Sequence, residues 1–408
     1  MPSESLAPGV PVQERPSAPD PIQAAPTAVT AFVGRARSGP VNDPVRVRSW
    51  GEFERGFGGL QPGMTLGPAV RLYFDNGGTE ALIVRVARAY ADDGSPIDDA
   101  DITDEALVPT DPLAVARRQG IHALDAAPGF NLLCLPPPTP TTDLSPASWA
   151  LAARFCAAHR ALLLVDAPAA WAADPRHLAT AALDGVDALV GAMGPELASH
   201  AALFFPRLRV VDPLHPLGVA TVVPCGAVAG VIARTDVRRG VWKAPAGTEA
   251  TVSGTLGPSH ALTDAEHAVL NPLGVNGLRR LPGQGLVVWG ARTLASRQAP
   301  EWRYVPVRRT ALFLERSLDQ GLDWVVFEPN GEPLWAQIRQ VVGNFMSQLF
   351  RQGAFQGPSE RDAWFVKCDR STMTQADIDA GRLTVEVGFA PLKPAEFTVI
   401  RVRKRTQT

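Results

Sequence analysis

The sequence predicts a two-domain α/β protein, in which a mostly parallel α/β domain is followed by a smaller α+β domain. The first observation is length, because 408 residues exceed what one hydrophobic core usually holds. The second is a set of apolar runs without polar alternation, at 131–135, 161–165 and 208–211, as in strands buried on both faces of a sheet. Third, helical stretches such as 146–159 separate these runs, and this alternation is typical of a parallel layer.

The chain begins with an arm rather than with part of a core. Residues 1–26 contain seven prolines and little apolar periodicity, so we expect an extended segment. A short strand around 10–14 would have to join a sheet edge, because Pro11 cannot donate a ladder hydrogen bond. The elements expected next are strands at 27–34 and 81–86 and a short helix at 49–59.

Candidate catalytic residues are present, but no catalytic motif joins them. Asp166 directly follows an expected strand, where catalytic aspartates often lie. The chain has no GxSxG elbow, and the partners that a triad needs cannot be identified. Capping a turn is the simpler role for Asp166, and a Ser/His/Asp hydrolase stays open as an alternative. The other candidates are the bases His159, His200 and His215 and the nucleophile Ser199.

Signatures of bound nucleotides and metals are missing from the sequence. No GxxxxGK[ST] loop, HExxH or CxxC occurs, and the four cysteines are scattered, which is typical of buried free thiols. The acidic segment 91–105 lacks EF-hand spacing and predicts a solvated loop. We therefore expect no metal or cofactor and no enzyme activity. Neither a signal peptide nor an apolar run of ~18–20 residues is found, so we expect synthesis in the cytosol and no membrane insertion.

Charge is unevenly distributed along the chain. From Ala268 onward there are 19 Lys and Arg against 13 Asp and Glu, whereas the rest holds 20 against 28. A basic last third predicts that this part faces something negative, either nucleic acid or an acidic protein surface. A nucleic-acid-binding protein is therefore a second alternative, although no recognised nucleic-acid-binding module is found.

One long amphipathic helix is expected in the last third. Apolar residues recur at three- and four-residue steps from Leu334 to Phe350, between Pro333 and Gly353. Between that proline and that glycine the only charged residues are Arg339 and Arg351. The polar face of this helix is therefore thin and purely basic.

Short segments along most of the chain carry a family resemblance. In the N-terminal part they are 8–10 (PGV), 27–34 (TAVTAFVG), 57–59 (FGG) and 74–78 (FDNGG). Later they are 223–233 (VPCGAVAGVIA), 234–240 (RTDVRRG), 241–247 (VWKAPAG), 270–276 (LNPLGVN), 288–294 (VWGARTL), 307–309 (VRR), 327–330 (FEPN), 353–357 (GAFQG), 381–388 (GRLTVEVG) and 394–397 (PAEF). In this order they resemble the contractile tail sheath proteins of phages, R-type pyocins and extracellular contractile injection systems.

The resemblance implies a two-domain sheath subunit. Its parts would be an N-terminal arm (1–26), an outer α/β domain (27–267), an inner, tube-facing domain (268–395) and a C-terminal arm or strand (396–408). Terminal strands exchanged between subunits would complete the inner domain by β-augmentation. The short linker where many phage sheaths carry a large insertion implies a compact subunit. Pro11 stands where the family more often has an aromatic residue.

The resemblance also implies a mechanical function and a set of partners. Subunits would polymerise as stacked rings around an inner tube, and contraction would drive the tube through a target envelope. The partners would be further copies of the chain, the tube protein, and baseplate and terminator proteins, with no nucleic acid bound directly. Assembly would take place in the cytoplasm, in a particle that can be released from the cell.

Two groups of residues are the expected contact sites. Arg339 and Arg351 would attach the subunit to the tube, because repeated exposed ion pairs hold and yet release. The C-terminal strand would present alternate residues to its two sides, and its last basic residues would brace contacts between subunits. The residues expected to take part in strand exchange are Val10, Val12, Glu14, Phe397, Val399, Arg401, Arg403, Lys404 and Arg405.

Overall fold

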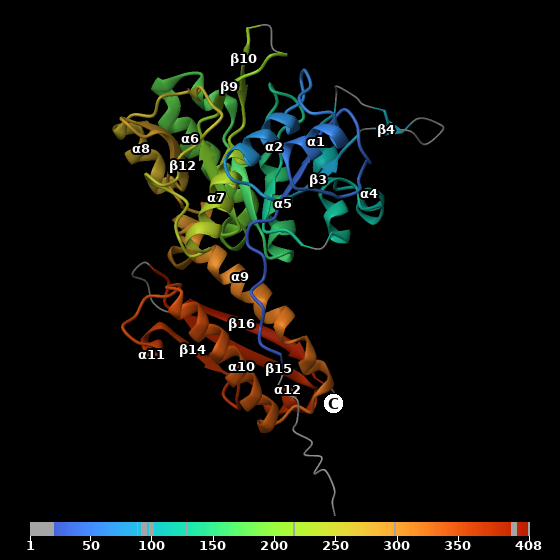
Figure 1. Ribbon diagram of the computed structural model, residues 1–408, viewed down its shortest axis with the longest axis vertical. Helices are drawn as coiled ribbons and strands as arrows, with labels where there is room; N and C mark the ends of the chain where they lie inside the picture. Colours follow the sequence, from blue (N-terminus) through green and yellow to red (C-terminus); the bar gives the residue numbers. More distant parts are fainter. Residues whose placement is uncertain are drawn as a thin grey trace, which may run out of the picture.

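A computed structural model describes residues 20–87, 89–90, 96–97, 102–127, 129–214, 217–297, 299–392 and 398–406. The molecule has two parts, a large one and a smaller one beneath it, joined by a long helix (Figure 1). We call residues 27–297 the first domain and residues 299–406 the second domain.

An eight-stranded sheet forms the middle of the first domain. Its strands are β1 Thr30–Gly34, β2 Val45–Val47, β3 Ala81–Arg85, β6 Leu132–Cys134, β7 Leu162–Asp166, β8 Ala201–Phe205, β12 Val275–Leu281 and β13 Gly285–Trp289. Their order is β13-β12-β8-β7-β6-β1-β3-β2. The pairings from β12 across to β3 are parallel, and the edge strands β13 and β2 run antiparallel to their neighbours. The predicted mostly parallel sheet is confirmed.

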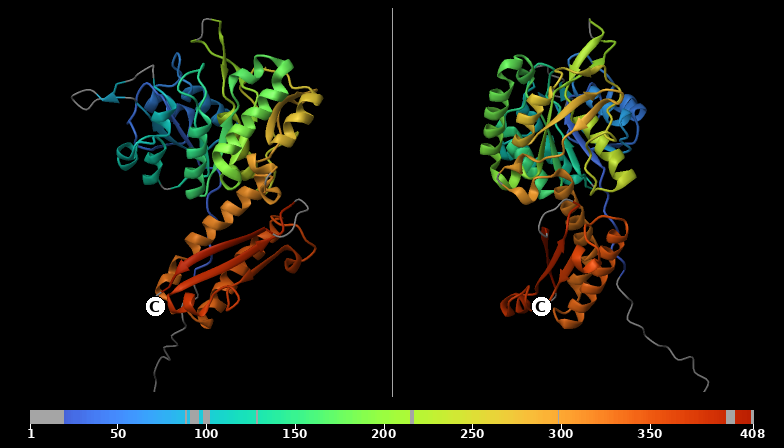
Figure 2. Two further views of the ribbon diagram at one scale, coloured as in Figure 1. Left: turned by 180° about the vertical axis from the view of Figure 1, so that it is seen from behind. Right: turned by 90° about the vertical axis from the view of Figure 1, so that its left-hand side faces the viewer.

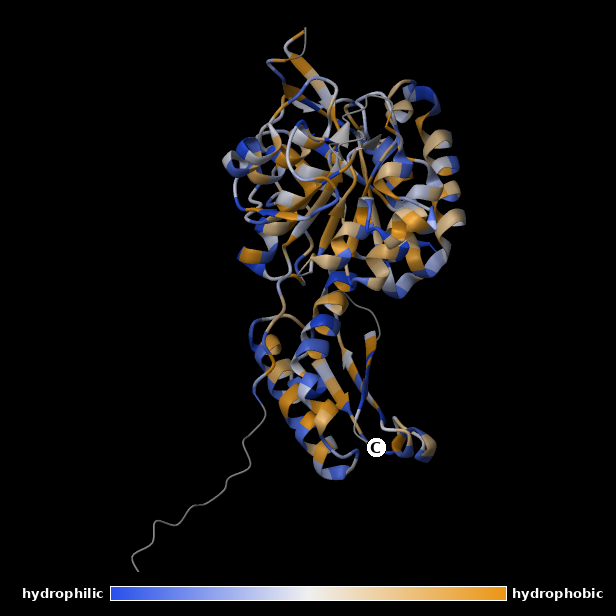
Figure 3. Ribbon diagram, turned by 90° about the vertical axis from the view of Figure 1, so that its right-hand side faces the viewer, coloured by the Kyte–Doolittle hydropathy of each residue, from blue (hydrophilic) through white to orange (hydrophobic). Residues whose placement is uncertain are grey.

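Helices cover both faces of this sheet, so its strands are apolar on both sides. One face packs against α1 Trp50–Phe57, α2 Leu66–Asp75 and α7 Cys225–Arg239. The other face packs against α5 Pro146–Ala158, α6 Leu178–Ala198, α8 Asp264–Leu270 and the 3₁₀ turn η1 Gly120–Ala126. Hydrophobic residues accordingly gather in the strands between the helical layers (Figure 3). Short helices α3 Asp104–Leu107 and α4 Pro112–Ala116 and the β4–β5 pair, Ala89–Tyr90 and Pro96–Ile97, complete this side. Most of the acidic segment 91–105 lies outside the described residues.

Two glycines let α7 approach α2 closely. A Cβ at Gly226 would lie 1.9 Å from the Ala69 carbonyl oxygen, and one at Gly230 would lie 2.4 Å from the Tyr73 carbonyl oxygen. Both distances are too short for any side chain, so these positions of the helix need glycine. The close packing of α7 on α2 therefore explains the two glycines in the segment 223–233.

A projecting hairpin corrects one part of the sequence analysis. The run 208–211 is not a strand of the large sheet. It forms β9 Leu208–Val211, which pairs antiparallel with β10 Val219–Val222 and with the short β11 Gly257–Pro258. Its residues alternate between buried and exposed, because only one face of the hairpin packs on the domain. The strand that follows β7 in the large sheet is instead β8, which comes just before β9 in the chain.

The second domain is an α+β unit, as predicted. Helices α9 Val305–Gly321 and α10 Glu332–Arg351 pack against a sheet of order β14-β15-β16. Its antiparallel strands are β14 Trp364–Lys367, β15 Arg382–Phe389 and β16 Thr398–Arg405. Short helices α11 Glu360–Ala363 and α12 Gln375–Asp379 flank the sheet. The long helix expected from Leu334 is α10.

The domain boundary lies later than the sequence indicates. A boundary at 267/268 would cut the large sheet, because β12 pairs with β8 and β13 pairs with β12. The chain enters the second domain with α9. The described end of the N-terminal arm also belongs there, since Ile22 is buried in its core and the Ala25 amide donates to Ser317 Oγ at 3.0 Å. This segment descends from β1 along α9 (Figures 1 and 2).

Candidate assembly surfaces

Arginines of α9 bind the lower edge of the large sheet. The helix lies under the amino ends of four adjacent parallel strands, and three of its side chains donate to groups just before those strands. Arg308 donates to His200 Nε2, just before β8. Arg316 donates to two carbonyls, that of His159 before β7 and that of Phe130 before β6. Arg309 donates to the carbonyl of Thr27, before β1. We call this set the α9 joint. Hydrogen bonds to charged groups contribute about 1.5–3 kcal/mol each, so the joint ties the two domains together firmly.

The centre of the α9 joint is a buried bidentate ion pair. Arg309 Nη1 and Nη2 lie 2.7 and 2.6 Å from Asp236 Oδ1 and Oδ2, and the two side chains are only 3% and 2% exposed. Nη2 also donates to the Thr27 carbonyl at 2.8 Å. Both charges are therefore compensated inside the protein, as buried charges must be.

His200 cannot act as a base in this setting. Its Nδ1 lies 3.2 Å from the Ala161 carbonyl, and its Nε2 accepts from Arg308, which stacks 4.5 Å from the centre of the Trp302 ring. Burial, and then the charge of Arg308, lower the pKa of His200 to about 3. The ring is neutral at physiological pH and serves as a hydrogen-bonding spacer between the domains.

The other predicted catalytic candidates are not brought together. Asp166 lies at the carboxyl end of β7, where Oδ1 accepts from the Cys225 amide at 2.9 Å at the start of α7. Burial raises the pKa of this carboxyl to about 7. Ser199 lies before β8, at the opposite edge of the sheet, and its Oγ donates to the Glu196 carbonyl at 2.7 Å. His159 is also at that opposite edge, and His215 lies outside the described residues.

The C-terminal strand closes the sheet of its own chain. β16 pairs with β15 over all eight residues, and Arg401 Nε lies 2.7 Å from Glu386 Oε1 across the pair. The expected alternation is confirmed, with Val399, Arg401 and Arg403 exposed and the residues between them buried. Phe397 and the segment holding Val10, Val12 and Glu14 lie outside the described residues.

The two basic residues at the end of β16 differ in their surroundings. Lys404 Nζ lies 3.0 Å from Asp319 Oδ1 and 2.8 Å from Asp323 Oδ1, and its side chain is 11% exposed. Arg405 points to the exposed side of the sheet. Within one chain, Lys404 therefore holds β16 to the end of α9, and Arg405 is available to another molecule.

The two arginines of α10 also differ. Arg339 donates to Glu332 Oε1 at 2.6 Å and to the Cys368 carbonyl, and only a third of its side chain is exposed. Arg351 lies exposed in the last turn. The rest of the solvent-exposed face carries neutral amides, at Gln337, Gln340, Asn344 and Gln348.

No alternative kind of site is found in the described part of the chain. Among those residues, no group of three or more His, Cys, Asp or Glu side chains could hold a metal ion. None of the helices described above is both long and apolar enough to cross a membrane.

Comparisons with known proteins agree with one another. Residues 191–294 match the phage tail sheath protein central domain, and residues 297–405 match the phage tail sheath C-terminal domain. The tail sheath protein of Burkholderia phage BcepMu is 27% identical over 205 residues, which span 48% of this chain and 40% of that protein.

Solved structures match over nearly the whole chain. A chain of the anti-feeding prophage helical sheath in the contracted state is 30% identical with a TM-score of 0.71, and the match covers 98% of this chain and 99% of that one. A chain of the anti-feeding prophage baseplate is 30% identical with a TM-score of 0.69, covering 99% and 100%. A chain of the contracted sheath complex of the extracellular contractile injection system PVC is 26% identical with a TM-score of 0.70, covering 98% and 97%.

Proposed function

The chain belongs to the contractile tail sheath family, whose members are structural proteins, and we propose that it polymerises as stacked rings around an inner tube. Contraction of this polymer would drive the tube through a target envelope. The energy would come from surface buried between subunits, so the subunit itself would need no nucleotide. The particle is a phage tail or a tail-like contractile particle.

The observation that carries the proposal is that both ends of the described chain lie on the second domain. Segment 20–26 packs on α9, and the edge strand β16 is the last element of the chain. Arms that leave from one small domain are suited to join neighbouring copies of that domain. The second domain would therefore be the inner, tube-facing one.

We propose that β16 pairs in the polymer with β15 of a neighbouring subunit, in the register that it has within one chain. The eight-residue pairing and the Arg401–Glu386 ion pair show that the two strands are complementary. Exchanging an identical element between copies preserves these contacts and costs little. Lys404 would then brace a neighbour through Asp319 and Asp323, and the strand expected around Val10, Val12 and Glu14 would extend the same sheet.

Attachment to the tube is assigned to α10. Arg351 would make the charged contact, assisted by the exposed part of Arg339 and by the neutral amides between them. Exposed ion pairs contribute about 0.2–1 kcal/mol each, so such contacts are weak singly and strong when repeated.

The remaining partners follow from the relatives. One relative is a chain of a baseplate and another is a chain of a helical sheath, so we propose that this chain binds copies of itself and a baseplate. A terminator protein would close the far end, and assembly would take place in the cytoplasm. The comparisons and the described residues give no support to the nucleic-acid-binding or hydrolase alternatives.

Electron microscopy of the purified chain tests this function. We expect hollow, striated cylinders from the full chain, and folded monomers from chains that lack 1–19 or 398–408. Cylinders of normal yield from either truncated chain would contradict the strand exchange. A full chain that stays monomeric at high concentration, alone and with its tube protein, would contradict the proposed polymer.

A further inference from the structure

The middle strand of the second-domain sheet has no free edge. β15 pairs with β14 along one edge and with β16 along the other, over all eight residues of β16. A β16 strand from a neighbouring copy would need the edge that the chain's own β16 already covers. The two pairings therefore exclude each other, and the proposed exchange first requires that β16 leave its own sheet.

Contacts of β16 within its own domain oppose this release. Ile400 and Val402 are 3% and 5% exposed in the core of the second domain. Near the end of the strand, Lys404 is bound to Asp319 and Asp323. Release would expose the two apolar side chains to water and separate Lys404 from both carboxylates. Subunits with a released β16 are therefore a small minority of the free chains.

The link between the two strands also favours pairing within one chain. Residues 390–397 join β15 to β16, and eight residues are more than the two to five that a β-hairpin needs. The link is therefore long enough for β16 to fold back on β15. A short link gives a tethered strand an effective concentration on the order of 1 mM. At micromolar concentrations of other chains, the chain's own β16 wins the competition for β15.

We propose that the pairing of β16 with its own β15 is an autoinhibitory contact, which keeps free subunits closed until they meet the end of a growing polymer. This inference rests on the proposed strand exchange and adds its regulation. At the end of a polymer a neighbour's β15 is held close by, so its effective concentration rises and β16 exchanges. The exchanged contacts are the same as the closed ones, so the barrier lies in the release. Assembly therefore starts with a lag.

A reversible disulfide tests whether β16 must leave its own sheet. Thr384 and Arg403 lie directly opposite each other in the β15–β16 pair, on the face of the sheet away from the core. Opposite Cα atoms of antiparallel strands are about 4.5 or 5.5 Å apart, which suits a disulfide. Thr384→Cys with Arg403→Cys keeps the ion pairs of Arg401 and Lys404. The four native cysteines are buried, so the new pair should oxidise selectively.

The same two cysteines report the closed and the exchanged state. Oxidation of the dilute double variant should give a bridge within one chain, which stays a monomer on a non-reducing gel. This locked chain should not form cylinders, and reduction should restore them. Oxidation of cylinders formed by the reduced variant should instead give a ladder of linked chains, because each β16 then pairs with a neighbour's β15.

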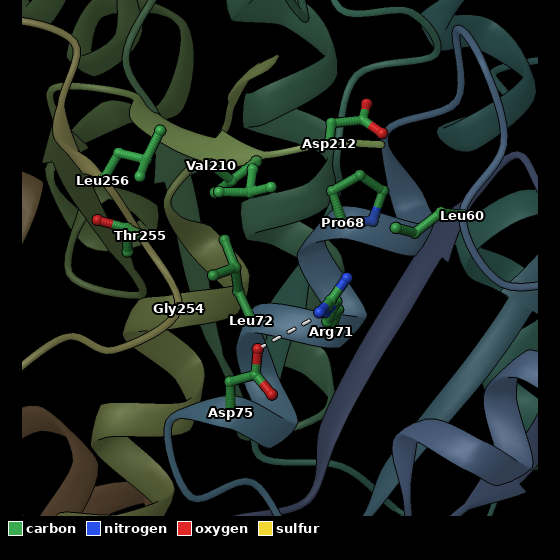
Figure 4. A pocket seen from close by; sticks show the side chains of 11 residues that line it. Leu60, Pro68, Arg71, Leu72, Asp75, Val210, Asp212, Gly254, Thr255 and Leu256 are labelled. Carbon is green, nitrogen blue, oxygen red and sulfur yellow. Dashed lines mark ion pairs between the residues drawn. The ribbon is translucent and has the colours of Figure 1, made fainter. Parts of the chain in front are cut away.

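The matched control is Arg209→Cys with Thr221→Cys. These residues are also an opposite arginine–threonine pair, in the antiparallel β9–β10 hairpin of the first domain. The next residue of β9, Val210, lines a pocket of the first domain (Figure 4). Neither strand of this hairpin takes part in the proposed exchange. Oxidised control chains should therefore form cylinders at normal yield.

Two outcomes would overturn the autoinhibition and leave the sheath function intact. If the dilute double variant forms no bridge within one chain, β16 is not closed on its own β15. If the locked chain forms cylinders normally, neighbours add to the outer edge of β16 without its release.

Failure of the sheath function gives a different result, in which neither the native chain nor the reduced variant forms cylinders. Oxidation at rising concentration then still decides the autoinhibition. Bridges within one chain at micromolar concentration that give way to linked dimers toward about 1 mM support it. The same proportion of the two products at every concentration overturns it.

The lag before assembly measures how strongly Lys404 holds β16. Lys404→Ala should shorten the lag in light scattering by about tenfold, as expected for a lost charge-assisted hydrogen bond. It should also lower the final yield, because the exchanged state loses the same contact. Lys367→Ala is the matched control, since this exposed lysine lies on β14 at the other edge of the sheet, and its lag should equal that of the native chain. A lysine that only braced the neighbour would lengthen the lag, so an equal or longer lag for Lys404→Ala would overturn its role in the closed state.

Discussion

Replacing Arg309 by methionine tests whether the α9 joint holds the two domains together. The substitution keeps a long side chain but removes both hydrogen bonds to Asp236 and the one to the Thr27 carbonyl. Asp236 would then be a carboxylate left 2% exposed without its partner. Breaking a buried pair on one side costs about 3–5 kcal/mol, which is a large part of the 5–15 kcal/mol stability of a typical protein.

Unfolding of the whole chain in denaturant, monitored by tryptophan fluorescence, measures this loss of stability. We expect the midpoint of Arg309→Met to fall strongly, and the double variant Arg309→Met with Asp236→Leu to recover much of the loss, because an apolar pair leaves no charge buried. The matched control is Arg239→Met, in an ion pair of α7 that is exposed to solvent. Its partner Glu249 lies 2.7 Å away, but the side chains are 49% and 61% exposed, so about 0–1 kcal/mol is expected.

A loss below about 1 kcal/mol for Arg309→Met, no larger than that of the exposed control, would refute the reasoning. A double variant as unstable as Arg309→Met alone would show that the cost lies in lost packing and not in the unpaired carboxylate.

Three further predictions follow from single residues. Burial raises the pKa of Asp166 from 3.8 to about 7, so the folded state binds this proton more tightly than the unfolded state does. The contribution of Asp166 to stability should therefore fall as pH rises from about 4 to about 7. Asp166→Asn should flatten a plot of unfolding midpoint against pH in this range, and an unchanged slope would contradict the prediction. Lys404→Ala should reduce the yield of sedimented cylinders more than Arg405→Ala, because Lys404 binds two carboxylates, and equal yields would argue against that role. Arg351→Glu should give cylinders that lack a tube in electron micrographs. Arg339→Ala should mainly lower thermal stability, because the Arg339 guanidinium is bound within its own domain. Tube-filled particles at normal yield from Arg351→Glu would show that α10 is not the charged attachment surface.

The parts of the fold that could be predicted are those whose signal is local. The run at 131–135 contains β6, and the run at 161–165 covers β7 except for its last residue, Asp166, because a strand covered by helices on both sides is apolar along most of its length. The helix α10 follows from its three- and four-residue apolar repeat. The alternation along β16 follows from the two-residue period of a strand.

The parts of the fold that differ from the prediction depend on contacts between segments far apart in the sequence. The sequence AALFF at 201–205 and LRVV at 208–211 are both apolar, and only the fold decides that the first enters the sheet and the second starts a hairpin. The strand β12 contains Arg279 and Arg280 and lies in the basic last third of the sequence, whereas its parallel partner β8 lies about seventy residues earlier.

The α9 joint was missed for the same reason. Arg309 and Arg316 are seven residues apart and so share one face of the helix, which is a visible signal. Their acceptors are backbone carbonyls at the ends of strands, and no sequence pattern marks which carbonyl a guanidinium will meet. The seven-residue spacing of the two arginines could have indicated that this face of the helix binds something, but not which carbonyls it binds.

The α9 joint has a mechanical consequence. The helix α9 is bonded near the ends of four strands and also packs in the core of the second domain. We therefore expect little bending between the two domains, so that the subunit moves as one rigid body. Force applied at either end then reaches the other end without being absorbed by bending. In the proposed polymer, movement between subunits would therefore take place in the terminal segments proposed to link them, and the lengths of those two segments would limit how far neighbouring subunits can turn.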